Sequence, residues 1–207
     1  KDPITVDDVL NSPMIAWPFR MLMCCLVTDG GGALIVTSAD RAKDFPNKPV
    51  YVLGTGESVE TPMVSQMQDF TSSKAFRVSG KKAFDEAGIK HSDVDHLMIY
   101  DAFAHLPLYG LEDLGFCKKG EGGRFVADGN LISGVGKLPF NTDGGGLCSN
   151  HPGNRGGMTK ILEAVRQARG EAHPAVQVPN CDLVLAHGTG GMLATRHGSA
   201  TVILERE

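Results

Sequence analysis

The sequence lacks several features that would place it in other classes of protein. It has no run of about 20 apolar residues, the length of a membrane-spanning helix, and no cationic-then-apolar N-terminal signal. Its 20 basic and 24 acidic residues include no Lys/Arg cluster that would follow a phosphate backbone. We therefore expect a cytoplasmic protein with no membrane span and no nucleic-acid partner.

Metal-binding and disulfide patterns are also lacking. The five cysteines are odd in number, and none stands in a Cys-x-x-Cys or other metal-ligand spacing. We expect reduced thiols, no metal and no covalently bound cofactor. The adjacent pair Cys24-Cys25 lies in an apolar run, which favours buried structural thiols over a nucleophile.

Glycine, in contrast, is abundant, with 26 of 207 residues. Its runs at 30–32, 144–146, 156–157 and 190–191 each lie beside an apolar segment. Glycines so placed let backbone approach a ligand or another backbone closely, which a low-complexity linker does not require. With 42% hydrophobic residues, the chain can bury a compact core.

Apolar patterning predicts strands alternating with helices, and hence an α/β fold. Strands are expected at 51–53, 95–100, 183–186 and 200–204, and helices at 72–88, 102–114 and 158–169. The run 21–38 predicts two further strands joined through a glycine turn.

An internal similarity links the two glycine-rich ends of the chain. Residues 26–36 resemble 183–204, each an apolar run, a glycine run and a second apolar run. A chance match of two hairpins is the alternative to a repeated unit. Because the chain begins at Lys1, and only the second copy follows a full αβ unit, we interpret the sequence as a truncation lacking most of one repeat.

The most specific motif is Asn-Thr-Asp-Gly-Gly-Gly-Leu-Cys-Ser-Asn-His-Pro-Gly at 141–153. Its glycines bring a loop close to a ligand, and His151-Pro152 places an imidazole just before a helix. A helix N-terminus disfavours a protonated ring, so His151 is a candidate base or hydrogen-bond donor. A histidine that only caps the helix is the alternative.

This motif resembles the thiolase active-site pattern, Asn-x-x-Gly-Gly followed ten residues after the Asn by His-Pro. The matching residues, at the same spacing, are Asn141, Gly144, Gly145, His151 and Pro152. In that family the histidine activates a nucleophilic cysteine and lines an oxyanion hole for the thioester carbonyl. The resemblance implies these roles for His151, with Asn141, Gly144 and Gly145 forming the surrounding loop.

A second loop follows the strand expected at 183–186. The segment His187-Gly188-Thr189-Gly190-Gly191 is similar to the thiolase loop Cys-x-Gly-Gly-Gly, with histidine replacing the cysteine, and to the histidine loop of the sterol carrier protein type. The resemblance implies that His187 moves the proton at the substrate α-carbon. Gly188, Gly190 and Gly191 are expected to form the oxyanion loop. The alternative is a strand-end histidine bonded to a backbone carbonyl.

Tyr100-Asp101-Ala102-Phe103 stands where thiolases carry Asn-Glu-Ala-Phe and the sterol carrier type carries His-Asp-Cys-Phe. The family's Asn holds a water of the oxyanion hole. Tyr100 would replace the Asn and its water or act as an acid/base group, and we include Asp101 as a candidate catalytic residue. A tyrosine that merely ends a buried strand is the alternative.

The resemblance implies a layered βαβαβαββ half of a thiolase-like fold, with part of the preceding half. We expect residues 1–45 to end the N-terminal half, 46–75 to connect, and 76–207 to form the C-terminal domain. The full-length protein is expected to be a homodimer. A small OB-fold subunit is a further candidate partner.

Three functions remain open, and the first two are enzymatic, with an acyl-CoA ligand and coenzyme A as substrate or product. In the first, an acyltransferase, a cysteine outside this chain is acylated and His151 activates it. In the second, a retro-aldolase releases a short acyl-CoA from a 3-hydroxyacyl-CoA, with Tyr100 as the acid/base group and His151 polarising the thioester. The third is a non-catalytic lipid-binding protein. The Tyr100 substitution tilts the choice toward the aldolase, and this chain alone is expected to be inactive.

Overall fold

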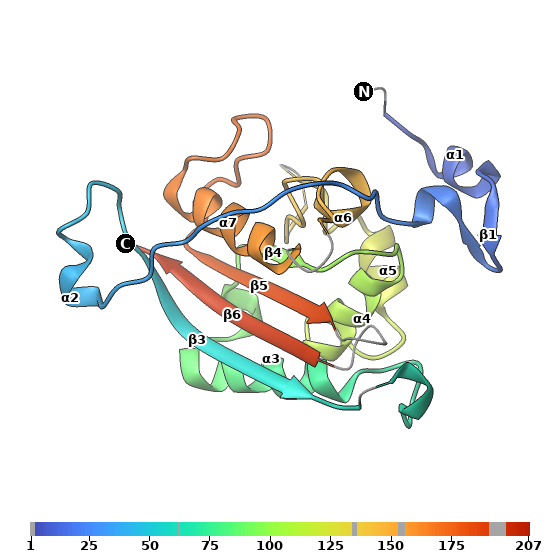
Figure 1. The fold of residues 1–207 in the computed structure, drawn as a ribbon, viewed down its shortest axis with the longest axis horizontal. Helices are drawn as coiled ribbons and strands as arrows, with labels where there is room; N and C mark the ends of the chain where they lie inside the picture. The colour runs from blue at the N-terminus through green and yellow to red at the C-terminus, as the bar shows by residue number, and fades with distance from the viewer. Residues whose placement is uncertain (1–2, 62, 134–135, 153–155, 191–197) are drawn as a thin grey trace.

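The computed structural model describes residues 3–61, 63–133, 136–152, 156–190 and 198–207. Its centre is a four-stranded mixed sheet in the order β3-β6-β5-β4 (Figure 1). β6 pairs antiparallel with β3 and β5, and β4 pairs parallel with β5. The expected α/β class and all four expected strands are confirmed: β3 (Val50–Val59), β4 (His96–Ile99), β5 (Leu183–Gly190) and β6 (Gly198–Arg206).

Two long helices cover opposite faces of this sheet. α3 (Lys74–Ala87) packs on the face that carries Leu97, Ile99 and Leu185, and α7 (Gly156–Arg169) packs on the face that carries Met98 and Val184. Successive side chains of a strand point to opposite faces, so residue parity decides which helix a strand residue meets. The other elements are α1 (Val6–Asn11), β1 (Met14–Ala16), β2 (Phe19–Arg20), η1 (Met21–Met23), α2 (Ala39–Ala42), η2 (Val64–Gln66), η3 (His91–Asp93), α4 (Leu106–Asp113), α5 (Gly122–Ala127) and α6 (Gly145–Cys148).

β3 approaches α3 closely because two of its residues are glycines. A Cβ at Gly54 would lie 2.1 Å from the Ala83 carbonyl oxygen, and one at Gly56 would lie 1.9 Å from the Ser79 carbonyl oxygen. No side chain fits at these distances. β3 also lies within residues 46–75, the expected connecting segment, yet it pairs with β6 along its length. The domain boundaries stay a prediction.

A short segment that follows α5 and precedes α6 in the sequence bridges to β4, on the edge of β4 that does not face β5. Phe140 forms a parallel bridge with Leu97, whose amide donates to the Pro139 carbonyl at 3.0 Å. The Asn141 amide returns a bond to the Leu97 carbonyl at 2.9 Å. This bridge brings the start of the 141–153 motif beside the strand that leads to Tyr100.

The two strands expected within 21–38 are absent, and that prediction is wrong. Residues 21–23 form η1, and residues 26–38 have no regular secondary structure. A strand needs one continuous backbone neighbour. Here Cys24 forms a single isolated bridge with Phe103, and the next amides bond to two separate segments, Cys25 to the Ala102 carbonyl and Leu26 to the Gly146 carbonyl. The hairpin similarity with 183–204 therefore does not extend to the structure, since only the second segment forms a strand pair.

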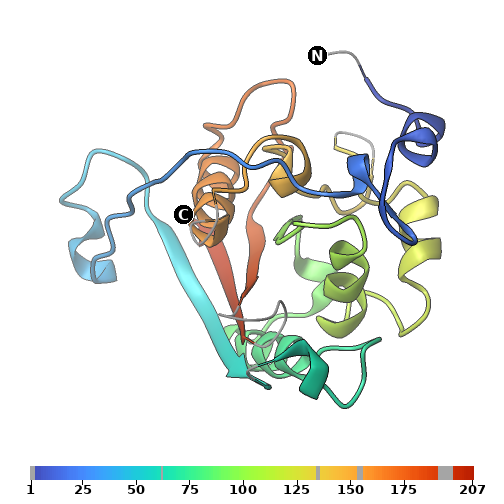
Figure 2. The same cartoon turned by 45° about the vertical axis from the view of Figure 1, so that its right-hand side comes forward.

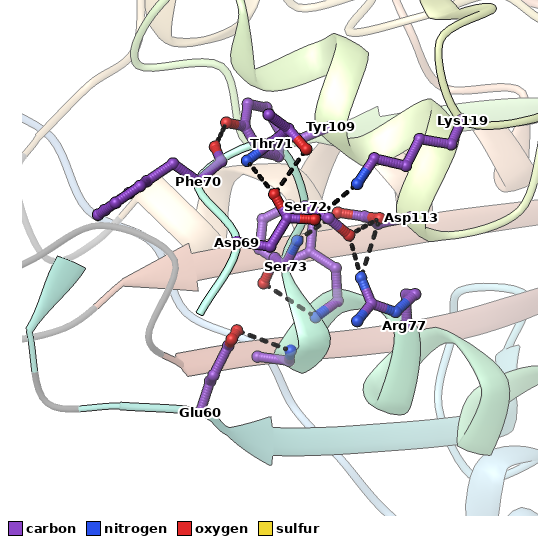
Figure 3. A network of polar contacts seen from close by, with 12 residues as sticks. Glu60, Asp69, Phe70, Thr71, Ser72, Ser73, Arg77, Tyr109, Asp113 and Lys119 are labelled. Carbon is purple, nitrogen blue, oxygen red and sulfur yellow. Dashed lines mark hydrogen bonds and ion pairs between the residues drawn. The ribbon is translucent and has the colours of Figure 1, made fainter. Parts of the chain in front are cut away.

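A polar network fixes the start of α3 (Figure 3). The buried Asp113 carboxylate accepts from the Ser72 hydroxyl at 2.7 Å and the Ser73 amide at 2.5 Å, and it pairs with Arg77 at 3.4 Å. A negative charge beside a helix N-terminus is stabilising. The network thus ties α4, which ends at Asp113, to the first turn of α3.

We predict that Asp113→Asn lowers the free energy of unfolding by about 1–3 kcal/mol, because a buried, charge-assisted acceptor is lost. Urea denaturation of the protein measures the change. Asp85→Asn is the matched control, since Asp85 pairs with Lys81 on the exposed side of α3. Equal midpoints for the Asp113 variant and the control would contradict the proposed tie.

Candidate active site

The Tyr100 side chain and the His151 ring meet at the carboxyl end of β4. Tyr100 follows Met98 at strand spacing and therefore lies on the α7 side of the sheet. Its hydroxyl oxygen is 2.6 Å from His151 Nε2. Gly156, the first residue of α7, lies beside the phenol, and a Cβ there would be in ordinary contact with Tyr100 Cε2 at 3.5 Å. Two residues predicted separately from sequence thus form one pair.

The surroundings of the Tyr100 phenol favour its protonated form. Burial raises the pKa of Tyr100, and the nearby Cys25 and Asp101 add to the increase. A phenol whose pKa is raised keeps its proton at neutral pH and donates it in a hydrogen bond. With the imidazole in its Nδ1-protonated tautomer, His151 Nε2 accepts this hydrogen bond from the phenol. The pair is a phenol donor backed by an imidazole base.

Asn141 holds the motif loop against β4 with its side chain. Its Oδ1 accepts from the Ile99 amide at 2.9 Å, and its Nδ2 donates to the Ile99 carbonyl at 2.7 Å. Its φ of 44° is left-handed, a conformation that Asn tolerates better than most residues. Asn141 therefore fixes Ile99, the last residue of β4, and with it the following Tyr100 relative to the loop that carries His151.

Asp101 anchors the glycine loop rather than facing the phenol-imidazole pair. Its Oδ1 accepts from the Gly146 amide at 2.7 Å and pairs with Lys160 Nζ at 3.2 Å. A Cβ at Gly145 would lie 2.1 Å from Asp101 Oδ2, which explains why the loop needs glycine there. Gly144, with a φ of 91°, is the N-cap that precedes α6 and turns the chain into this position. The motif glycines therefore fit around a carboxylate.

Lys160 is a residue that the sequence reasoning missed. Its side chain is 2% exposed and forms a buried ion pair with Asp101. A signal was present, because Lys160 shares the buried stripe of α7 with Ala164 and Gln167 at helical spacing. A lysine on such a stripe needs a buried partner.

A buried polar cluster joins the rest of α7 to β4. The Thr142 hydroxyl donates to Glu163 Oε1 at 2.7 Å and accepts from Gln167 Nε2 at 2.9 Å. His96 Nε2 is 3.1 Å from the same hydroxyl oxygen, so the ring nitrogen is the donor. Burial, aided by the Lys160 charge, lowers the pKa of His96 to about 3. The ring is neutral, and the cluster stabilises the layer that supports the site.

His187 lies on the opposite face of the sheet from Tyr100 and His151. Its ring packs edge-on against Phe76 of α3, with 4.3 Å between the ring centroids, and its Nε2 is 2.9 Å from the Ser199 hydroxyl oxygen. The parity of β5 places Leu185 and His187 on the α3 side. Burial lowers the pKa of His187 to about 3. The structure therefore does not bring His187 together with the phenol-imidazole pair, and the sequence reasoning overlooked the parity of the strand.

A cavity of about 580 Å³ opens beside Tyr100 at the carboxyl ends of the parallel strands β4 and β5. Gly157, Gly188 and Gly190 contribute to its lining. The carboxyl ends of parallel strands are where α/β proteins bind ligands, and the volume falls in the range of small-molecule sites. Gly188 and Gly190 line this pocket from within β5 rather than from a loop, and Gly191 lies outside the described residues.

The cysteines differ from expectation in one respect. Cys24 and Cys25 are half-buried rather than buried, and burial raises the pKa of the Cys25 thiol. Cys148, within the motif, is exposed. Within the described residues, no group of three His, Cys, Asp or Glu side chains is arranged to hold a metal ion. The helices in the described part of the chain are too short or too polar to cross a bilayer.

This fold and the Asn141–His151 motif define a thiolase-type domain, and comparison with known proteins agrees. Residues 56–206 match the family described as thiolase C-terminal domain-like. The chain therefore belongs to the thiolase family.

Its relatives include enzymes of two kinds. It is 35% identical over 188 residues to an acetyl-CoA acetyltransferase of Methanothermobacter thermautotrophicus, covering 91% of this chain and 49% of the relative. It is 40% identical over 172 residues to a steroid side-chain-cleaving aldolase of Thermomonospora curvata, covering 81% and 43%. A solved structure named Ltp2-ChsH2(DUF35) aldolase superposes with a TM-score of 0.87 at 35% identity, covering 99% of this chain and 52% of that chain. The chain thus spans about half the length of these relatives.

We predict that acid destabilises the protein partly through His187. The pKa of His187 lies near 3 in the folded state against 6.5 in the unfolded chain, so only the unfolded state gains a proton between these values. Stability is lost as pH falls through this window, at about 1.4 kcal/mol per pH unit for one such histidine. Urea denaturation between pH 4 and 7 should show a shallower slope for His187→Gln than for the wild type. Parallel slopes would refute the assignment.

We also predict that Lys160→Met lowers the free energy of unfolding by about 3–5 kcal/mol, because it leaves the Asp101 carboxylate buried without its cation. The double variant Asp101→Asn/Lys160→Met should recover part of this loss, because no buried charge is left unpaired. Urea denaturation measures both. If the loss in the double variant equals the sum of the losses in Asp101→Asn alone and Lys160→Met alone, the residues do not form the ion pair described above. Lys81→Met removes the exposed pair on α3 and serves as the control.

Proposed function

We propose that the protein is an acyl-CoA carbon–carbon lyase that cleaves a 3-hydroxyacyl-CoA by a retro-aldol reaction. The carrying observation is the 2.6 Å contact between the Tyr100 hydroxyl and His151 Nε2. A retro-aldol step needs one group to take the hydroxyl proton and a path to pass it on. The phenol-imidazole pair supplies both functions at the edge of a ligand-sized cavity.

The proton and electron movements balance with these two residues alone. The substrate hydroxyl passes its proton to the Tyr100 oxygen as the phenol proton moves to His151 Nε2. The β-carbon oxygen forms a carbonyl, the bond between the α- and β-carbons breaks, and its electron pair forms the thioester enolate. The imidazolium of His151 returns a proton through Tyr100 to the α-carbon. The products are a ketone or aldehyde and a shorter acyl-CoA.

The surrounding residues would hold the Tyr100 and His151 side chains in position relative to each other. Asn141 fixes the loop to the strand, and Asp101 with Lys160 fixes the glycines before His151. Such preorganisation counts in catalysis, because a misplaced acid/base group loses much of its effect. Asp101 and Lys160 are positioning residues in this proposal. His187 is buried on the other face, and the proposed step does not use it.

A second candidate is the acyltransfer reaction of thiolases, with a cysteine from outside this chain as nucleophile. The specific observation in its favour is the Asn-x-x-Gly-Gly spacing before His151, together with a 35% identical relative named acetyl-CoA acetyltransferase. In that reaction His151 would activate the cysteine and Tyr100 would donate to the thioester oxygen. The two candidates differ in substrate, since acyltransfer consumes a 3-ketoacyl-CoA and free coenzyme A.

The proposed assembly includes an acyl-CoA ligand and a small partner subunit. The support for the subunit is the solved aldolase with a TM-score of 0.87, whose name joins two components. A homodimer of the full-length protein remains a prediction.

We predict that Tyr100→Phe lowers kcat for cleavage of a 3-hydroxyacyl-CoA by about 10²- to 10⁴-fold, the range for loss of an acid/base group. The assay uses the full-length protein with any copurifying subunit and follows release of the shorter acyl-CoA by liquid chromatography. Tyr51→Phe, in β3, is the matched control and should retain wild-type turnover.

Full activity of Tyr100→Phe would remove the proposed mechanism. Cleavage of the 3-ketoacyl-CoA only with added coenzyme A, and none of the hydroxy compound, would establish acyltransfer instead. If the wild type cleaves neither thioester, the protein is a binding protein.

A further inference from the structure

Residues 26–32, here called the strap, run across the outer side of α6 and α7. Figures 1 and 2 both show this blue segment crossing the orange helices. A Cβ at Gly30 would lie 3.5 Å from Pro152, and one at Gly32 would lie 2.4 Å from Leu162 Cδ1. A side chain at the second position would require Leu162 to shift. The glycines thus let the strap lie directly on α7 and on the residue after His151.

The strap binds the histidine loop at both ends. At the start of the loop, the Leu26 amide donates to the Gly146 carbonyl at 3.3 Å. At its end, the His151 amide donates to the Thr28 hydroxyl oxygen at 3.0 Å. The second bond joins residues 123 positions apart in the chain. The two contacts hold the span from Gly146 to His151 at both of its ends.

The loop needs such a restraint because of its composition. Gly144 and Gly145 both have positive φ, and Gly146 packs beside His151, with a Cβ position 3.3 Å from His151 Cδ2. Glycines lose more conformational freedom on ordering than other residues, so a glycine-rich loop holds a side chain less firmly by itself. The 2.6 Å contact with Tyr100 requires that the imidazole stay in place.

We infer that Thr28 is a positioning residue for His151, acting from the strap through the backbone of the histidine. This inference rests on the proposed function, because its effect on turnover presupposes that His151 acts in the reaction. The Thr28 hydroxyl acts on the backbone of the histidine and so leaves the imidazole free to meet the phenol. The segment whose composition suggested a strand pair serves instead as a clamp.

The test compares Thr28→Val, which removes the hydroxyl at nearly constant shape, with Thr28→Ser, which keeps it. Hydrogen exchange of the full-length protein, followed by mass spectrometry, reports on the loop peptide that contains residues 146–152. Loss of one hydrogen bond should speed exchange of this peptide about five- to tenfold in Thr28→Val. Thr28→Ser and the neighbouring control Val27→Ser, at a 97% exposed position, should match the wild type.

Turnover of a 3-hydroxyacyl-CoA is the second measurement. Thr28→Val should lower kcat about five- to tenfold with little change in KM, because the substrate cavity is unchanged and only the acid/base pair is displaced. Thr28→Ser should restore kcat. Wild-type exchange and wild-type kcat in Thr28→Val would overturn the inference. If the wild type cleaves no thioester, the proposed function fails, and the exchange measurement alone decides whether Thr28 clamps the loop.

Discussion

The buried contact between Asp101 and Lys160 connects the parts of the site that come from separate stretches of the chain. Asp101 follows Tyr100 directly, so its position is set by the end of β4, and its carboxylate binds the amide of Gly146 and the ammonium of α7. Strand, loop and helix therefore meet at one carboxylate. Two buried charges are costly unless they satisfy each other and their neighbours, and here the Gly146 amide adds a further donor.

The same lysine sets the electrostatics of the layer behind the site. Burial raises the pKa of Asp143, and the Lys160 charge opposes that increase. For His96 the effects of burial and Lys160 act in the same direction and keep the ring neutral. The Lys160 charge thus lowers the pKa of both the Asp143 carboxyl and the His96 ring. Its removal would change several groups together, which makes this region a unit rather than a set of independent contacts.

Local signals predicted much of this protein, and long-range pairing decided the rest. The strands and the two long helices followed from apolar periodicity, and the motif spacing identified Asn141 and His151 because both lie in one short loop. The pairing of Tyr100 with His151 depends on the bridge beside β4, and His187 depends on strand parity, so neither geometry could be read from residue types. The segment 21–38 was predicted as two strands because its composition suits them, but it meets other backbone only at isolated points, such as the bridge between Cys24 and Phe103.

Asn141 gives the sheet a neighbour that is not backbone. Its amide group offers one acceptor and one donor to Ile99, as a peptide unit of an adjoining strand would. The ladder beside β4 therefore continues past the residue at which the main chain turns away. An aspartate of the same size has two acceptors and no donor, so its carboxylate would face the Ile99 carbonyl with no hydrogen to share. The side chain that the sequence assigns to the loop around His151 thus also extends the hydrogen-bond ladder of the sheet.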